Sequence, residues 1–266
     1  MTARSCAIES LEVHVAHACN LACESCSHYS NHTHRGTLSV EAAEASFALW
    51  SHRLQPRVLC LLGGEPTLNP NLTELVRLAR RCWPEALLRV STNGLLLHRH
   101  PDLPAALQGN AKLDFTIHHP SAEYAAEVES AVQLARRWER EHGLHVSFKQ
   151  VWMGWTQRYT GFGASMAPFS DGQPRQSWEV CPAKHAPQLH EGRIWKCAPL
   201  AYLPMQHARY GLGEAWRPYL AYQPLEATAT DDEVETFFRR EDEPTCAMCP
   251  ATPRPLALPA PLRGAR

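Results

Sequence analysis

Three cysteines within one short segment constrain this chain more than any other feature of its sequence. They stand in Cys19-Asn20-Leu21-Ala22-Cys23-Glu24-Ser25-Cys26, directly after a strand-like run at 11–16. This spacing lets one loop carry three thiolates to three corners of a 4Fe-4S cube, which leaves the fourth iron open to bind a substrate or cofactor. A structural zinc site is the alternative, because nearby histidines could supply a fourth ligand. Those histidines are His17, His28, His32 and His34.

Two polar, glycine-containing turns follow strand-like runs further along the chain. Gly63-Gly64-Glu65-Pro66 comes after the apolar run 58–62, and Ser91-Thr92-Asn93-Gly94 comes after the run 87–90. Ligands of α/β proteins bind at the ends of strands that carry such turns. Both turns are therefore candidate binding loops.

The cysteine loop and the two turns, in this order and each after a strand, resemble the motifs of the radical S-adenosylmethionine (SAM) enzymes over residues 11–150. The resemblance implies a 4Fe-4S cluster whose open iron chelates SAM, a Gly-Gly-Glu-Pro turn that holds the methionyl amine, and a Ser-Thr-Asn turn near the ribose. It assigns Cys19, Cys23 and Cys26 to the cluster, and Gly63, Gly64, Glu65, Ser91 and Asn93 to SAM. One position departs from the pattern, because Ser25 stands where an aromatic residue usually lies near adenine.

The composition indicates a protein with a full hydrophobic core and excludes several partners. The 266 residues are 44% hydrophobic and 20% charged, and the net charge of −1 provides no basic surface for nucleic acid. The sequence contains neither a signal peptide nor an apolar run of about eighteen residues that could span a membrane. The ten cysteines cluster at metal-ligand spacings. We therefore expect a cytoplasmic protein in a reducing environment.

Alternating strand-like and helical runs predict an α/β fold. The expected strands are 11–16, 58–62, 87–91, 113–118 and 145–151, and the expected helices are 40–50, 72–82, 103–107 and 123–142. Repeated βα units place parallel strands side by side through right-handed crossovers. With a sixth strand expected later, the predicted class is the partial (β/α)6 barrel of the resembled family, with a small C-terminal twitch-like subdomain.

Five further side chains within this core can be interpreted. His118 and His119 end a strand, and because adjacent strand residues point to opposite sides, only one can face the barrel interior. We expect His118 to face it. Lys149, on the next strand, is a candidate for contact with the SAM carboxylate or a substrate group, whereas Cys60 and Cys82 are expected to pack in the core.

The second half of the chain contains four more cysteines: Cys181, Cys197, Cys246 and Cys249. A hairpin predicted at 188–196 ends on the second of them, and the last two form a CxxC, so together they make the two arms of a metal centre. Beside a radical SAM core they resemble the twitch extension, which implies an auxiliary 4Fe-4S cluster. We expect a radical SAM core at 1–155, a remaining barrel segment with the auxiliary cluster at 156–249, and a Pro-rich tail at 250–266.

Two polar stretches have less specific interpretations. The histidine-rich segment 28–34 is expected to be a surface loop without a function of its own. The run 226–243 is acidic, and it precedes the auxiliary-cluster cysteines, which should sit over the substrate pocket. It is either a solvated helix face or a surface that attracts a cationic substrate.

The reaction class depends on what happens to the substrate radical. The chain resembles aminoglycoside-tailoring epimerases, in which a cysteine thiol returns hydrogen to the opposite face of the radical. This implies that Cys249 is the donor and that Cys181, Cys197 and Cys246 hold the auxiliary cluster. The alternative is an aminocyclitol dehydrogenase, in which all four cysteines hold a cluster that accepts an electron. We expect a cationic aminoglycoside substrate and an external electron donor of flavodoxin or ferredoxin type.

Two hypotheses lie outside this class. A modifier of ribosomal peptides would share both clusters but usually has an extra leader-binding domain before the first strand. A non-catalytic zinc protein would explain the cysteines but not Gly-Gly-Glu-Pro or Ser-Thr-Asn-Gly. Iron and sulfide analysis separates zinc from clusters.

Overall fold

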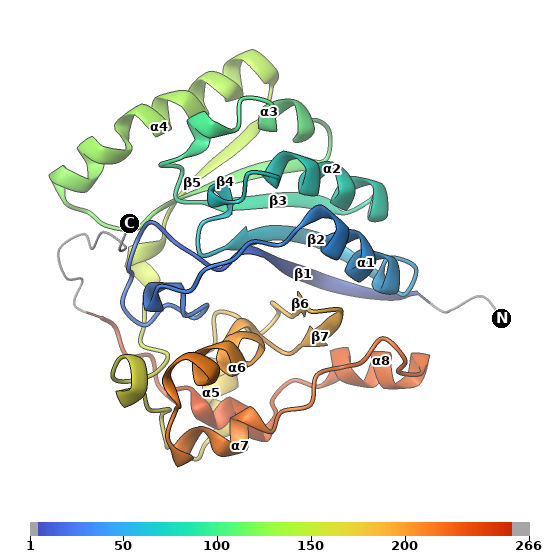
Figure 1. Cartoon of the computed structure of the whole chain (residues 1–266), viewed down its shortest axis with the longest axis vertical. Coiled ribbons are helices and arrows are strands. Elements are labelled where there is room, and N and C mark those ends of the chain that lie inside the picture. Colours follow the sequence, from blue (N-terminus) through green and yellow to red (C-terminus); the bar gives the residue numbers. More distant parts are fainter. Residues whose placement is uncertain (1–4, 257–266) are drawn as a thin grey trace.

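A seven-stranded sheet organises the molecule, which Figure 1 shows as a computed structural model that describes residues 5–256. The strand order is β5-β4-β3-β2-β1-β6-β7. The strands are β1 (Cys6–Ala16), β2 (Leu54–Gly63), β3 (Leu87–Thr92), β4 (Ala111–Ile117), β5 (His145–Gln150), β6 (Gln188–His190) and β7 (Arg193–Trp195). Strands β1 to β6 pair in parallel, and β7 is antiparallel to β6. The predicted α/β class and the 188–196 hairpin are confirmed.

Four helices follow the first four strands as predicted. They are α1 (Val40–Trp50), α2 (Leu72–Cys82), α3 (Leu103–Ala106) and α4 (Ala122–His142). The Ser39 hydroxyl caps α1 by accepting the Ala42 N–H at 3.1 Å, which satisfies one of the free amides of the first turn. The later helices are α5 (Pro174–Glu179), α6 (Ala198–Tyr210), α7 (Arg217–Leu220) and α8 (Asp231–Arg239). Among residues 5–256, no helix combines the length and apolar character needed to cross a membrane.

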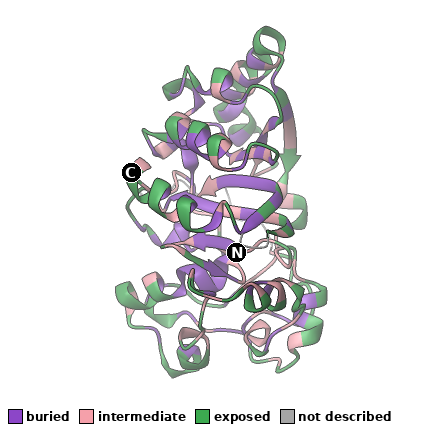
Figure 2. Ribbon diagram, turned by 90° about the vertical axis from the view of Figure 1, so that its right-hand side faces the viewer, coloured by how far each residue is buried: buried purple, intermediate pink, exposed green. Residues whose placement is uncertain are grey.

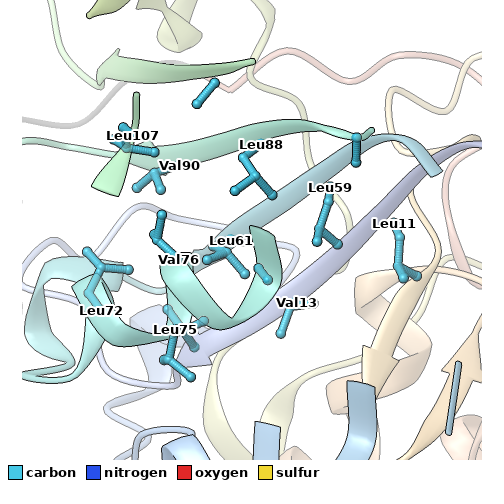
Figure 3. Close-up of a cluster of buried hydrophobic side chains, with 14 of the residues drawn as sticks. Leu11, Val13, Leu59, Leu61, Leu72, Leu75, Val76, Leu88, Val90 and Leu107 are labelled. Atoms are coloured by element: carbon cyan, nitrogen blue, oxygen red, sulfur yellow. The ribbon is translucent and has the colours of Figure 1, made fainter. Parts of the chain in front are cut away.

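One face of the sheet forms the main hydrophobic core. Alternate residues of β1, β2 and β3 point toward α2, which supplies Leu72, Leu75 and Val76, all fully buried (Figure 3). Burying each such side chain contributes about 1.5–3 kcal/mol. Figure 2 shows the strands as the most buried part of the chain.

The opposite face of the sheet is polar. Arg89 on β3 forms ion pairs with Glu12 on β1 at 3.3 Å and with Asp114 on β4 at 3.7 Å. The Cys60 thiol is buried as expected, but it lies in this polar layer and accepts the Arg89 Nε–H at 3.1 Å. The interior of the open barrel is therefore lined by paired charges.

The sixth parallel strand, which we expected later in the chain, is β6. It belongs to the C-terminal hairpin and pairs with β1 at the side of the sheet opposite β5. The first part of the Pro-rich tail runs beside residues 155–157, where Pro255 bridges Thr156. The remainder of the predicted tail, 257–266, lies outside the described residues.

Candidate functional site

The Gly-Gly turn after β2 is hydrogen-bonded to the cysteine loop after β1 and packs closely against it. The Gly64 amide donates to the Ala16 carbonyl at 2.8 Å, and the Glu65 amide donates to the Ala18 carbonyl at 2.9 Å. A Cβ added to Gly64 would lie 2.2 Å from the Ala18 oxygen, and one added to Gly63 would lie 2.4 Å from the Ala16 oxygen. Both positions require glycine because the two backbones approach so closely.

Glu65 joins this turn to the turn after β3. Its buried Oε1 accepts hydrogen bonds from the Thr67 amide at 3.0 Å, from the Thr67 hydroxyl at 2.6 Å, and from the Thr92 hydroxyl. Its Oε2 accepts the Asn93 amide at 2.8 Å and keeps a lone pair for a further donor. Burial raises the pKa of Glu65, and these hydrogen bonds only partly oppose the rise.

The loops surround a cavity of about 190 Å³. Its wall includes most of the predicted core site: Cys19, Cys23, Cys26, Gly63, Gly64, Glu65, Ser91, Asn93 and His118. Burial raises the pKa of the Cys23 thiol to about 12, so a nearby cation is needed to hold the thiolate form. The structure thus brings the cysteine loop and both turns around one space.

The two histidines at the end of β4 have different surroundings. The His118 ring lines the cavity, with Nε2 3.0 Å from the Thr116 hydroxyl and Nδ1 3.4 Å from the Cys23 sulfur. Burial lowers the pKa of His118 to about 4, so the ring is neutral near pH 7. His119 instead accepts the Ser121 amide at 3.0 Å, at the start of α4.

Lys149 lies away from this cavity wall. Its Nζ contacts Asp114 Oδ2 at 2.5 Å, within the polar layer of the sheet. The structure thus places Lys149 in the polar layer, and its contact with the SAM carboxylate or a substrate group stays a prediction. Cross-strand neutralisation of a buried carboxylate explains its position.

The spacing of the ligand groups indicates which metal group fits. Among residues 5–256, no three His, Cys, Asp or Glu side chains converge closely enough to hold one metal ion. A zinc ion needs all its ligand atoms at about 2.0–2.3 Å from one centre. Three thiols that line one cavity fit a 4Fe-4S cube, because each of its thiolates binds a different iron.

The four C-terminal cysteines form a second group. The pKa of Cys197 is raised by burial first, and then by the charges of Cys249, Cys181 and Cys246, so all four lie within electrostatic reach of one another. Three of them, Cys181, Cys197 and Cys249, line a cavity of about 220 Å³. Ser27 and Trp155 belong to the walls of both cavities, which makes them neighbours.

Sequence reasoning missed Trp155. Its Nε1–H donates to the Glu24 carbonyl at 2.7 Å, and its ring lies 6.1 Å from the His118 ring. The adjacent Ser25 is buried, and its hydroxyl accepts the Arg158 amide at 2.6 Å, so it faces the 155–159 segment. Nothing in the aperiodic sequence 152–180 singles out this tryptophan except its residue type.

The histidine-rich segment 28–34 is not the surface loop that we expected. Most of it is buried, and it includes a 3-10 turn at Ser30–His32. His32 Nε2 lies 3.1 Å from the Tyr159 hydroxyl, and His34 Nε2 lies 2.6 Å from Gln206 Oε1. The prediction was wrong because segments distant in sequence cover these rings.

The first part of the acidic run lies away from the cavities. Asp231, at the start of α8, pairs with Arg53, which directly precedes the amino-terminal end of β2. The cysteine loop and both turns lie at the opposite, carboxyl ends of the strands. Figure 1 shows α8 beside the beginning of β1. Glu241 and Asp242 pair with Arg175, while burial raises the pKa of the nearby Cys246 thiol and the charge of Glu243 adds to the rise. Within the described chain, no acidic residue of the run lines either cavity, and attraction of a cationic substrate by the run stays a prediction.

Comparisons with known proteins identify the family. The chain is 34% identical over 110 residues to GTP 3′,8-cyclase of Chlorobaculum tepidum, a match that covers 40% of this chain and about a third of that relative's length. Similar solved structures include BtrN in complex with AdoMet and 2-DOIA, with 14% identity and a TM-score of 0.49 over 90% of this chain and 85% of that one. Another is Streptococcus suis SuiB bound to S-adenosylmethionine, with 16% identity and a TM-score of 0.44 over 55% and 36%. These two likenesses carry no functional argument.

The family model of the radical SAM superfamily matches residues 13–145, which is half of the chain. This range contains the cysteine loop, both turns and most of the wall of the cavity that they surround, which Val151 and Trp155 complete. The chain therefore belongs to the radical SAM superfamily.

Proposed function

We propose that this chain is a radical SAM epimerase that inverts a sugar carbon of an aminoglycoside, converting neomycin C to neomycin B. The proposal rests mainly on two adjoining cavities, one lined by the first three cysteines and the other by Cys249. When bound, the first cluster and SAM supply a 5′-deoxyadenosyl radical that abstracts hydrogen from an unactivated C–H bond. A substrate held between the cavities has the two reactive groups on opposite sides.

The chain's own residues hold SAM in place around the first cavity. The Glu65 Oε2 lone pair and the Gly-Gly backbone are suited to a cationic amine, because both offer acceptors that are fixed before the ligand arrives. The neutral His118 ring adds a polar group without a competing charge. Trp155 forms part of the partition between the two cavities and helps to exclude water.

Cys249 is proposed as the hydrogen donor. Burial raises the pKa of its thiol to about 12, so it carries its hydrogen at neutral pH. Donation breaks the S–H bond, forms a C–H bond on the inverted face and leaves a thiyl radical. One electron from an external flavodoxin- or ferredoxin-type donor, together with one proton, restores the thiol. Cys181, Cys197 and Cys246 then remain as ligands for an auxiliary cluster.

A dehydrogenase is the second candidate, and the grouping of the four C-terminal cysteines favours it. Cys249 lies within electrostatic reach of Cys181 and Cys246, as a fourth cluster ligand would. A fully ligated auxiliary cluster could take the electron from the substrate radical. The product would then be a ketone two hydrogens lighter than the alcohol, with the second hydrogen lost as a proton.

A Cys249→Ala variant tests the proposal. For the epimerase, it should keep its iron and still form 5′-deoxyadenosine when substrate is added, but lose inversion. Cys197→Ala is the comparison, because removing a proposed cluster ligand should lower the iron content. If Cys249→Ala loses as much iron as Cys197→Ala, and the wild-type product is a ketone, the dehydrogenase is correct.

Metal analysis tests the two-cluster arrangement independently. Two cubes give about eight irons per chain, and replacing Cys19, Cys23 and Cys26 together by Ala should remove about half of them. The same triple variant should not cleave SAM. Zinc without iron in the wild-type protein would refute both candidate reactions.

A further inference from the structure

Three polar atoms beside the first cavity lack hydrogen-bond partners within the described part of the chain. They are His14 Nε2, His28 Nε2 and Ser30 Oγ. His28 and Ser30 line the cavity wall, and the His14 ring stacks on the His28 ring with centroids 5.1 Å apart. Each buried polar atom left unpaired costs about 1–3 kcal/mol, so three at one place indicate that a polar ligand completes them.

His14 is held rigidly although one of its nitrogens is unpaired. Only 4% of the residue is exposed, and its Nδ1 lies 3.1 Å from the Nδ1 of His17, so one of the two rings donates to the other. The Tyr202 ring of α6 packs against it at 4.3 Å, and the Tyr202 hydroxyl donates to Gln188 at 3.0 Å. Groups fixed in this way cost little further ordering when a ligand binds.

His14 lies next to the Gly-Gly turn that is proposed to hold SAM. It pairs with Leu62 in the β1–β2 ladder, next to the Ala16–Gly63 pair at the start of the Gly-Gly turn. Glu12 precedes His14 by two residues on the same strand, so both side chains lie on the polar face of the sheet. The unpaired atoms thus continue the polar interior of the barrel up to the cavity.

The chemistry of the group narrows the ligand class. These rings do not converge to hold a single metal ion, as holds throughout residues 5–256. Burial lowers the pKa of His14 far below its usual value, so the ring is neutral and provides no fixed charge for an anion. A neutral imidazole and a hydroxyl can accept from an ammonium group, and can both donate to and accept from a ligand hydroxyl.

We propose that His14, His28 and Ser30 form a substrate subsite that hydrogen-bonds the ammonium and hydroxyl groups of an aminated sugar or cyclitol. This inference rests on the proposed function and names the side of the first cavity that holds the substrate. The Ser30 hydroxyl lies against Gly64, since a Cβ added to that glycine would be 2.8 Å from Ser30 Oγ, so the subsite adjoins the space that Glu65 and Asn93 leave for SAM.

The test is calorimetric binding of the aminocyclitol 2-deoxystreptamine to the SAM-loaded holoenzyme. Ser30→Ala is the cleanest variant, because its hydroxyl has no internal partner and its loss leaves the fold intact. His14→Phe keeps the stacked ring but removes the nitrogens. Each variant should bind the probe about tenfold more weakly, since about 1.4 kcal/mol corresponds to one lost hydrogen bond.

Matched controls separate this subsite from the SAM site and from general damage. Ser46→Ala on α1 and His52→Phe, at an exposed position in the turn before β2, should bind the probe as the wild type does. SAM affinity and the cluster absorption spectrum should stay unchanged in Ser30→Ala and His14→Phe. Unchanged probe binding in these two variants, loss of SAM affinity instead, or no binding by the wild type at millimolar probe would overturn the inference.

The outcome is independent of whether the enzyme inverts or oxidises its substrate. An aminocyclitol dehydrogenase would use the same subsite, so failure of the epimerase reaction leaves a positive binding result standing. Conversely, if the enzyme inverts its substrate but Ser30→Ala and His14→Phe bind the probe as the wild type does, the proposed function stands and the proposed subsite is wrong.

Discussion

The Asn93 backbone amide donates a 2.8 Å hydrogen bond to Glu65 Oε2, and this contact joins the turn after β2 to the turn after β3. A Glu65→Gln variant places an NH₂ group or a weaker acceptor among four donors. We expect the free energy of unfolding to fall by about 1–3 kcal/mol and SAM affinity to fall with it. Urea denaturation measures the first and calorimetry the second. Glu74→Gln, at an exposed position on α2, should change stability by less than about 0.5 kcal/mol.

Gly64 should not tolerate a single added methyl group. The added Cβ would lie 2.2 Å from the Ala18 carbonyl oxygen. Because this oxygen belongs to the backbone, a side-chain rotation cannot relieve the clash, and the backbone of the cysteine loop must move. We expect Gly64→Ala to lose iron from the first cluster and to stop forming 5′-deoxyadenosine. Gly213→Ala is the matched control, because no atom lies within 4 Å of its added Cβ. Full iron content in Gly64→Ala would contradict the proposal that close packing of the Gly-Gly turn against the cysteine loop positions the cluster ligands.

Asp114 should contribute to stability in a pH-dependent way. Burial raises its pKa, but the hydrogen bonds from Lys149 and Ser147 and the charge of Lys112 outweigh burial and lower it below 3.8. A lowered carboxyl pKa in the folded state gives stability that is present above pH 3.8 and is lost as pH falls through the folded value. Asp114→Asn should therefore flatten the acid limb of the stability profile. Asp102→Asn, which is exposed, should keep the wild-type limb.

The first part of the acidic run should have no role in substrate capture. Asp232 and Glu226 lie at the end of the sheet opposite the cavities, so their charges are too distant to act through physiological salt, which screens over about 8 Å. Neutralising both, as Asp232→Asn with Glu226→Gln, should leave the KM for neomycin C unchanged. A several-fold rise in KM that disappears at high salt would restore the attraction hypothesis.

Local patterns in the sequence were sufficient for much of the fold. Ser39 and the apolar spacing after it predicted α1, and the run ending in Ser-Thr-Asn-Gly predicted β3 at nearly its observed bounds. The run ending in Gly-Gly-Glu-Pro predicted β2, which begins four residues earlier than expected, at Leu54. These features depend on neighbours within a few residues. The gathering of the cysteine loop and both turns followed from the rule that parallel strands bring their carboxyl ends to one edge.

What the sequence could not predict depends on contacts between distant segments. The partner of Lys149 follows from the register of β4 against β5, which no local pattern specifies. The burial of His32 requires Tyr159, and the anchoring of Trp155 requires the Glu24 carbonyl, each more than a hundred residues away. Strand β6 pairs with β1 and not with β5. The sequence pattern of a strand does not show which edge of the sheet it joins, so this pairing could not be predicted.

Turnover of neomycin C in D₂O tests the epimerase proposal most directly. The Cys249 thiol exchanges its hydrogen with solvent, so the deuteron that it returns must come from water. The account predicts one deuterium at the inverted carbon of the product, located by NMR and mass spectrometry, and none there in unconverted substrate. Product without deuterium at that carbon, or a ketone in its place, would contradict hydrogen return by Cys249.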